Sequence, residues 1–522
     1  MTRRIMEPTA RPDERKIGPN ATAVFLWFFL ALSVFYSGHL YSKDAFSKIN
    51  SMKNLVLDGS PYIDPSSHAW GIVGRDGKVF SQFSIGSILM MAPPAAVWLC
   101  AQRIAHRPLP LVAGAAITGF NLLYTAAAGL LIFLLLVRMG KKASTAFFFA
   151  NIAVFCTQLF PYAKTDWSEP SAFVWGLAGF VALMPRDADQ PSLRETITWA
   201  ACAMAASLIR IEYLLFFLFF IGADAVVGRR WSRIQTAGAI IAAAVVMLHA
   251  GYNWYRFGSA FNAGYTGQEN AGKEAASAAG SLARTAFGML FDRDTIKHVW
   301  WFFFSFGKNH WFWEAPLLGL APFAAAGWKS MPRAGRAMFL AALVYLPLHI
   351  YLLNTAAWCC TDWSWGVRYF YVTFPYLLLP LAFFSYDKPW RRRAAVALCA
   401  IGLAVSGTAA LTNFHVILEN QVAARGYRET MFGAGANSLA GAPFWSHAAA
   451  LPRQTIATVR AAAHRRWPLS WEQSRVKGLD IWPVGLSAAG APPVAAFGLW
   501  LAQIGIAAWW GRRMFRRFGY GK

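Results

Sequence analysis

Long apolar windows recur along this chain, and they limit its fold more than any other feature. Windows of about 17 to 25 mostly apolar residues, the length of a helix that crosses a bilayer, follow one another through most of the sequence. Only 14% of the 522 residues are charged, whereas soluble domains have roughly 25%. The alternating pattern of a membrane β-barrel does not appear, and helices also satisfy every backbone hydrogen bond in lipid. The sequence therefore predicts an all-α polytopic membrane protein.

The basic residues predict how the chain is threaded. Although the net charge is +24, 25 of the 49 Lys and Arg lie in short patches beside apolar segments. This placement follows the positive-inside rule for cytoplasmic loops and gives no support to a nucleic-acid partner. The seven patches are 3–16, 138–142, 186–194, 229–233, 329–336, 388–393 and 512–522.

If the patches are cytoplasmic, about twelve spans follow, with both termini inside. The expected spans are 20–38, 112–137, 143–161, 168–184, 194–210, 212–227, 235–253, 314–328, 337–354, 369–386, 394–412 and 490–511. If the apolar segment 84–105 were a further span, the basic patch 138–142 would lie outside the cytoplasm. We therefore expect this segment to form a re-entrant or membrane-surface helix broken at Pro93-Pro94.

This topology divides the chain into four parts. A cytoplasmic tail (1–19), which lacks a signal-peptide cleavage site, precedes a transmembrane module (20–412). An outer C-terminal loop region (413–489) follows, to which we assign no partner, and then a last span with a basic cytoplasmic tail (490–522). The module contains long outer loops at 39–111 and 254–313. Loops of this length are uncommon unless they carry function.

Asp44 lies about one turn beyond the first span and begins an amphipathic stretch that continues to Leu57. A partly desolvated carboxylate near the membrane surface can act as a general base toward a sugar hydroxyl. Asp is also a preferred helix N-cap, so a purely structural role is the alternative. Lys78 and Phe80 follow in the same outer loop, where we expect them to contribute to a donor-binding loop.

Further charges lie where apolar segments meet with almost no loop between them. Asp166 and Glu169 are candidates for acceptor binding or for a second acid, and a pair between Lys164 and Asp166 is the alternative. Arg210 is a candidate for the donor loop, although a self-neutralising pair with Glu212 would also explain it.

Cations at the predicted outer boundary are candidates for binding a phosphate. Lys308 and His310 lie between apolar stretches, and Arg368 opens a span that runs inward. An Arg at a helix start is disfavoured by the helix dipole and is therefore expected to pair with an anion. The planar guanidinium matches the geometry of a phosphate group. A salt bridge with Asp362 is the alternative.

Other chemistries have no sequence support. No nucleotide-binding loop or zinc motif occurs, and the six Cys residues lack metal-ligand spacing. We therefore expect no cofactor; a divalent metal is an alternative that no ligand spacing supports.

The order of these motifs resembles bacterial GT-C glycosyltransferases that use polyprenyl-phosphate-linked sugars, relatives of the protein O-mannosyltransferases and the lipid A aminoarabinose transferases. The resembling segments are Tyr41-Ser42-Lys43-Asp44, Gly74 to Gly86, Asp166 to Pro170, Asn253 to Gly258 with Asn262 to Tyr265, and Trp365 to Tyr369. The resemblance implies a catalytic carboxylate at Asp44. Many relatives carry a second acid next to it, and here Ala45 stands at that position.

The resemblance implies a GT-C-like bundle with a large first outer loop, in a bacterial inner membrane with its active site facing outward. The implied reaction moves a sugar from a polyprenyl-phosphate donor to a hydroxyl of a glycan, lipid or protein acceptor. A flippase or transporter of lipid-linked glycans, and a glycan polymerase or ligase, are the alternatives.

Overall fold

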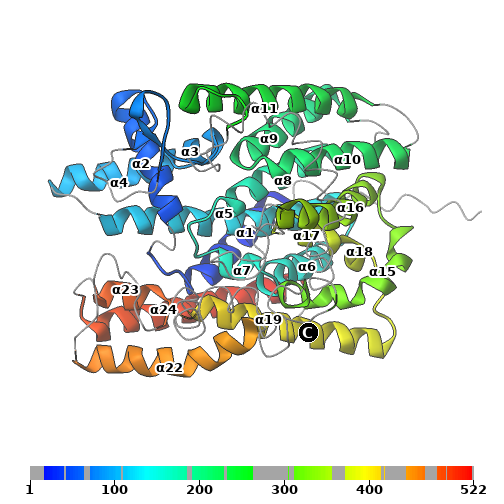
Figure 1. The fold of residues 1–522 in the computed structure, drawn as a ribbon. Coiled ribbons are helices and arrows are strands. Elements are labelled where there is room, and N and C mark those ends of the chain that lie inside the picture. The colour runs from blue at the N-terminus through cyan, green and yellow to red at the C-terminus, as the bar shows by residue number, and fades with distance from the viewer. Residues whose placement is uncertain are drawn as a thin grey trace, which may run out of the picture.

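The computed structural model describes most of the chain. It covers residues 17–39, 43–63, 71–106, 110–184, 191–228, 232–262, 304, 311–355, 371–412, 417, 443–464, 479–488 and 491–519. Helices dominate these residues, and the strands among them form one small three-stranded sheet (Figure 1).

The elements of the N-terminal half lead from the first helix to the long helix α11. They are α1 (Ile17–Ser33), α2 (Lys43–Asp58), β1 (Tyr62–Ile63), β2 (Ile72–Val73), η2 (Arg75–Gly77), β3 (Val79–Phe80), α3 (Ile85–Leu89), α4 (Ala92–Ala105), α5 (Pro110–Arg138), α6 (Ala143–Phe155), α7 (Leu159–Tyr162), α8 (Glu169–Leu183), α9 (Leu193–Ile209), α10 (Glu212–Gly228) and α11 (Arg233–Phe257).

The described elements of the C-terminal half include several very short helices. They are α14 (Trp311–Glu314), η3 (Pro316–Leu320), α15 (Ala321–Trp328), α16 (Arg333–Thr355), α17 (Phe374–Leu377), α18 (Leu379–Ala382), α19 (Pro389–Leu411), α22 (Pro443–His464), α23 (Trp482–Ala488) and α24 (Pro493–Arg517).

Five helical segments of the described chain are long and apolar enough to cross a membrane. They are Ile85–Ala105, Val112–Arg138, Arg233–Phe257, Pro389–Leu411 and Pro493–Arg517. Four of them match expected spans, and the fifth, Ile85–Ala105, lies in the segment for which the sequence predicts a re-entrant or membrane-surface helix. The prediction of an all-α fold with helices able to span a membrane is confirmed.

The expected count of about twelve spans is not met by these five segments. The expected span 143–161 is a 13-residue α6 followed by the short α7, and α9 and α10 have 17 residues each. In the described part of the expected span 369–386, residues 371–386, the α-helices are the four-residue α17 and α18, with Pro375 and Pro380 in their first turns. Proline removes a backbone donor, so a continuous apolar run does not give a continuous helix there.

The segment 84–105 is interrupted earlier than expected. The break between α3 and α4 falls at Met90 and Met91, and Pro93 and Pro94 lie in the first turn of α4. The expected break at the two prolines was wrong, because proline is tolerated in a first turn, where backbone N–H groups have no helical partner. At 21 residues the segment is long enough to span.

The first and last long helices lie side by side and antiparallel (Figure 1). The indole of Trp500 donates a hydrogen bond to Val34 O at 2.8 Å, and Trp510 donates to Ala23 O at 3.3 Å. The beginning of α1 therefore lies beside the end of α24, so both termini of the described chain belong to one end of the bundle. Further inside, α8 packs against α5 and α9, and α10 packs against α16.

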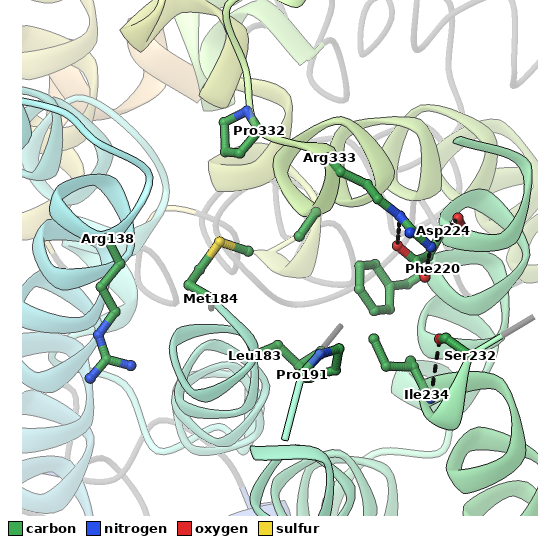
Figure 2. Close-up of a pocket in the computed structure, with 11 residues that line it drawn as sticks. Arg138, Leu183, Met184, Pro191, Phe220, Asp224, Ser232, Ile234, Pro332 and Arg333 are labelled. Carbon is green, nitrogen blue, oxygen red and sulfur yellow. Dashed lines mark hydrogen bonds and ion pairs between the residues drawn. The ribbon is translucent and has the colours of Figure 1, made fainter. Parts of the chain in front are cut away.

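Several basic patches meet at this same end. Helix ends from four of them line one cavity, which is drawn in Figure 2. Phe518 stacks on Phe147 at 4.6 Å, which brings the arginine-rich end of α24 to the same place. Lys141 lies 3.9 Å from the ring centre of Phe383, close to the patch 388–393. The patches therefore share one end of the bundle, and its assignment to the cytoplasm stays a prediction.

At the opposite end, the first long connection folds into a compact unit of α2, α3, α4 and the sheet. Strand β3 pairs antiparallel with β1 and β2 in the order β1-β3-β2. The buried Arg256 at the end of α11 binds this unit, because its Nη1 donates to Ser81 O and Phe83 O. A side chain at Gly74 would meet Arg256 O at 2.3 Å, so this close approach requires glycine.

Candidate functional site

Helix α2 carries the predicted base and a buried lysine on one face. Asp44 lies in its first turn and is partly exposed, and Lys48 follows one turn later with 2% of its surface exposed. Residues four apart on a helix share a face, so both side chains point to the same side. Asp44 in a first turn also suits the helix dipole, and the structural alternative therefore remains compatible with this placement.

The connection between α7 and α8 brings two further carboxylates into the protein. Asp166 and Glu169 are 0% and 1% exposed. The amide of Asn121 on α5 holds this connection in place by donating hydrogen bonds to Thr165 O at 2.8 Å and to Trp167 O at 2.6 Å. The side chains are buried because the connection is short and lies between packed helices.

Arg210 stands at the break between α9 and α10, where it contacts two acids. Its Nη1 donates to Glu169 Oε1 at 2.6 Å, and its Nη2 donates to Glu212 Oε1 at 2.7 Å. The predicted alternative of a pair with Glu212 is therefore present, but Glu169 shares the same guanidinium. Arg210 links the α8 carboxylate to the start of α10.

Helix α3 fixes the backbone at this break. Ser84 Oγ and Ser87 Oγ both donate to Ile209 O, at 2.7 and 2.6 Å. A Cβ at Gly86 would lie 2.3 Å from the backbone of Leu208, so glycine permits the two elements to approach. The unit of α2, α3, α4 and the small sheet thus packs directly against the residue that precedes Arg210.

These charges converge on Lys48. Burial lowers the pKa of Lys48, whereas the negative charges of Asp44, Asp166 and Glu169 oppose this shift, and Arg210 adds to it. The ammonium lies 5.0 Å from the ring centre of Phe83, and it makes no hydrogen bond or salt bridge among the residues that the structure describes. The structure therefore brings four predicted site residues around a lysine that sequence reasoning missed. The spacing Asp44-x-x-x-Lys48 was the available signal.

Two predicted donor-loop residues lie apart from this cluster. Phe80 is buried in β3, where its ring packs 5.9 Å from Tyr255 and 6.3 Å from Phe257. Lys78 is exposed, and its ammonium lies 5.8 Å from the ring centre of Tyr62. Phe80 therefore holds the small sheet against α11, and Lys78 lies on the surface of that sheet.

The predicted phosphate-binding residues Arg368, Lys308 and His310 lie outside the described residues. Beside the cluster stand three buried tyrosines on α10, α16 and α17, namely Tyr213, Tyr345 and Tyr376. Their hydroxyl groups have no hydrogen-bond partner among the described residues. Buried hydroxyls without partners are uncommon in folded proteins.

Lys164 belongs to a different network from the one expected. Its Nζ donates to Asp480 Oδ2 at 2.5 Å and to Thr412 O at 3.0 Å, and Asp480 also contacts His39 Nε2 at 2.7 Å. The predicted alternative of a pair with Asp166 was wrong for Lys164. Burial would raise the pKa of Asp480, but Lys164 and His39 outweigh it and hold that pKa well below its usual range. This network ties Asp480, and with it the segment that leads into α23, to the bundle.

Within the described parts of the chain, no three His, Cys, Asp or Glu side chains are arranged to hold a metal ion. The carboxylates of the cluster instead lie near Lys48 and Arg210, and Glu169 is paired with Arg210. Comparison of the sequence with models of protein families and with curated proteins finds no match.

Proposed function

We propose that the protein is an integral-membrane glycosyltransferase. In this proposal, it transfers a sugar from a polyprenyl-phosphate donor to a hydroxyl of a cell-envelope glycan, lipid or protein. The observation that carries the proposal is the convergence of Asp44, Asp166, Glu169 and Arg210 on Lys48, at the end of the bundle where the first long connection folds over it. A lipid-phosphate sugar is already activated, so the reaction needs a base and cations rather than a nucleotide site.

Exposure distinguishes the three carboxylates. Asp166 is fully buried, and Glu169 is buried and bonded to Arg210. Asp44 is partly exposed, so an acceptor hydroxyl can reach it. We therefore assign the general base to Asp44 and a supporting electrostatic role to the two buried acids.

The chemistry is a displacement with inversion at the anomeric carbon. Asp44 takes the proton of the acceptor hydroxyl while the acceptor oxygen bonds to the anomeric carbon, and the bond to the phosphate oxygen breaks. Negative charge then grows on the departing polyprenyl phosphate, which nearby cations stabilise. Lys48 is the described cation that supports this role best, because its ammonium has no hydrogen-bond partner among the residues that the structure describes. Arg368 and Lys308 stay candidates for the same role.

The number of membrane spans and their orientation are also part of this proposal. A GT-C-like bundle of about twelve spans would include α6, α9 and α10, which are shorter than the five long segments but pack in the same bundle. The membrane would be a bacterial inner membrane, with the Lys48 cluster at its outer face and the end rich in basic patches in the cytoplasm.

Transfer from a synthetic polyprenyl-phosphate monosaccharide by purified protein tests the proposal. Asp44→Asn should keep donor binding and lower the transfer rate by a factor of about a hundred to ten thousand. Asp58→Asn is the matched control, because Asp58 is exposed at the far end of the same helix. Transfer at the wild-type rate by Asp44→Asn would exclude Asp44 as the base.

Purified protein and lipid-linked sugars also distinguish a glycosyltransferase from the alternative functions. A flippase would move the lipid-linked sugar between leaflets of a vesicle without releasing polyprenyl phosphate. A polymerase or ligase would use lipid-linked chains and leave monosaccharide donors unconsumed. Either outcome would reject the proposed reaction.

A further inference from the structure

Two cysteines from distant parts of the sequence meet where α6 ends beside α19 (Figure 1). Cys156 directly follows α6 and is buried, and Cys399 lies on α19 and is partly exposed. Both are free thiols, and their side chains are hydrogen-bonded to each other. Two thiols in this contact are placed to form a disulfide, which requires close approach of both side chains.

Contacts around the pair hold the two backbones close together. A Cβ at Gly402, one turn after Cys399 on the same face of α19, would lie 2.6 Å from Cys156 O and 2.9 Å from Cys156 Cβ. This close approach therefore requires glycine. One turn further along α19, Ser406 Oγ donates to Thr157 O at 3.0 Å. These contacts do not involve the sulfur atoms, so the thiols are held together before any bond forms between them.

The pair lies at the middle of a helix that is long and apolar enough to cross a membrane. Cys399 lies ten residues after Pro389, the first residue of α19. At the α-helical rise this is about 15 Å, half of the roughly 30 Å hydrocarbon core of a bilayer. The same stretch of α19 exposes Val396, Ile401 and Leu403. An exposed apolar surface at this depth faces acyl chains, so a reagent that reaches Cys399 has to dissolve in lipid.

We propose that Cys156 and Cys399 are a redox-active pair that a lipid hydroperoxide oxidises to a disulfide. The sulfur of Cys399, the more exposed of the two, attacks the terminal oxygen of the hydroperoxide. The O–O bond breaks, the thiol proton passes to the lipid oxygen, and a sulfenic acid and a lipid alcohol form. The thiol of Cys156 then attacks the sulfenic sulfur, the S–S bond forms, and water leaves. The two thiols lose two electrons in total, and the hydroperoxide gains two.

The disulfide joins α19 to the junction of α6 and α7, shortly before the connection that carries Asp166. The cross-link closes a long loop of the chain, which restricts the unfolded state more than the folded state. Oxidation should therefore raise the resistance of the protein to unfolding. The pair does not depend on the proposed sugar transfer. A buried cysteine that only packs as a small apolar side chain is the opposing interpretation.

Treatment of the purified full-length protein in lipid nanodiscs with phosphatidylcholine hydroperoxide tests the proposal. After unfolding and alkylation of the free thiols, peptide mass spectrometry should show Cys156 linked to Cys399 in most molecules. Tributylphosphine, which enters lipid, should reopen the bond in intact nanodiscs, whereas the charged tris(carboxyethyl)phosphine should not. Cys202→Ser is the matched control and should form the link as the wild type does, because Cys202 is a buried cysteine of α9, outside the pair.

Trapping of sulfenic acid by dimedone distinguishes the roles of the two thiols. Cys156→Ser lacks the second thiol, so Cys399 should label several-fold more than in the wild type after hydroperoxide treatment. Cys156→Ala replaces this variant if the serine variant does not fold, and the link in the wild type is measured without any variant. Three results would overturn the proposal: no link between Cys156 and Cys399 in the treated wild type, equal reduction by the two phosphines, or equal dimedone labelling of the wild type and the Cys156 variant.

Discussion

The buried pair between Lys164 and Asp480 permits a quantitative test of how the C-terminal region is held. Both side chains are 2% exposed, their atoms are 2.5 Å apart, and 316 positions of sequence separate them. Asp480→Leu removes the carboxylate that the buried Lys164 ammonium contacts, while the hydrogen bond from this ammonium to Thr412 O remains. Loss of one partner of a buried pair costs about 3–5 kcal/mol, because the other charge is left uncompensated.

The reciprocal change should cost less. Lys164→Met leaves Asp480 in contact with His39, whose side chain is 17% exposed and can carry a proton. The loss should therefore fall near the lower limit of about 3 kcal/mol. The double variant has neither charge, so it should be more stable than Asp480→Leu alone.

Unfolding by sodium dodecyl sulfate at pH 7, followed by far-ultraviolet circular dichroism, measures the four proteins of this double-mutant cycle. The expected coupling is at least about 2 kcal/mol, because neighbouring residues in one network are not additive. Additive losses, with the double variant the least stable of the four, would refute the buried pair. Single losses within about 0.5 kcal/mol of wild type would do the same, since that is the effect of ordinary surface changes.

The same carboxylate predicts a pH dependence. The folded-state pKa of Asp480 is depressed below its ordinary value of 3.8. Its contribution to stability is therefore complete above that value and is lost as the pH falls toward the folded pKa. Wild-type protein should lose stability below about pH 4 more steeply than the double variant. Parallel curves for the two proteins would contradict the assignment.

Three further predictions concern other contacts. Gly402→Ala on α19 should destabilise the protein by about 1–3 kcal/mol, because a Cβ at this position would lie 2.6 Å from Cys156 O. Gly407→Ala is the control: a Cβ there has no neighbour within 4 Å, so a thermal-shift assay should show a neutral or stabilising effect. Arg256→Ala should speed proteolysis between residues 71 and 84, because Ser81 O and Phe83 O lose their donor; unchanged cleavage would show that other contacts hold this unit. Lys48→Met should lower sugar transfer well below the level of Lys53→Met, a change on the same helix beside Trp98; equal activities would remove Lys48 from the proposed mechanism.

The outline of the site was accessible from local sequence patterns. Asp44, Asp166, Glu169 and Arg210 attracted attention because each charge lies beside an apolar segment, where an unsatisfied charge is costly. The sequence does not show that these four residues lie close together in the folded protein. Their proximity depends on α3 packing against Ile209 and on Asn121 holding residues 165–167, contacts between segments far apart in the chain.

Lys48 and Phe80 also show that the sequence alone does not tell which residues belong to the site. Lys48 lies within the amphipathic stretch that the sequence predicts, and only packing shows that it is buried near the four charged residues of the cluster. Phe80 looked like a residue of a binding loop, but it packs in the small sheet against the end of α11. Side-chain periodicity indicates which residues share a face, and it does not indicate what that face meets.

The sequence by itself determined that the chain is helical, that four of its long apolar segments can cross a membrane, and that several basic segments group together. These properties follow from apolar length and charge position, which are local and add along the chain. The tertiary structure alone decided that apolar runs such as 369–386 are broken into short helices and that Lys164 pairs with Asp480 rather than with Asp166. Proline geometry and a contact across 316 positions decide such features, and neither changes the average composition of a window.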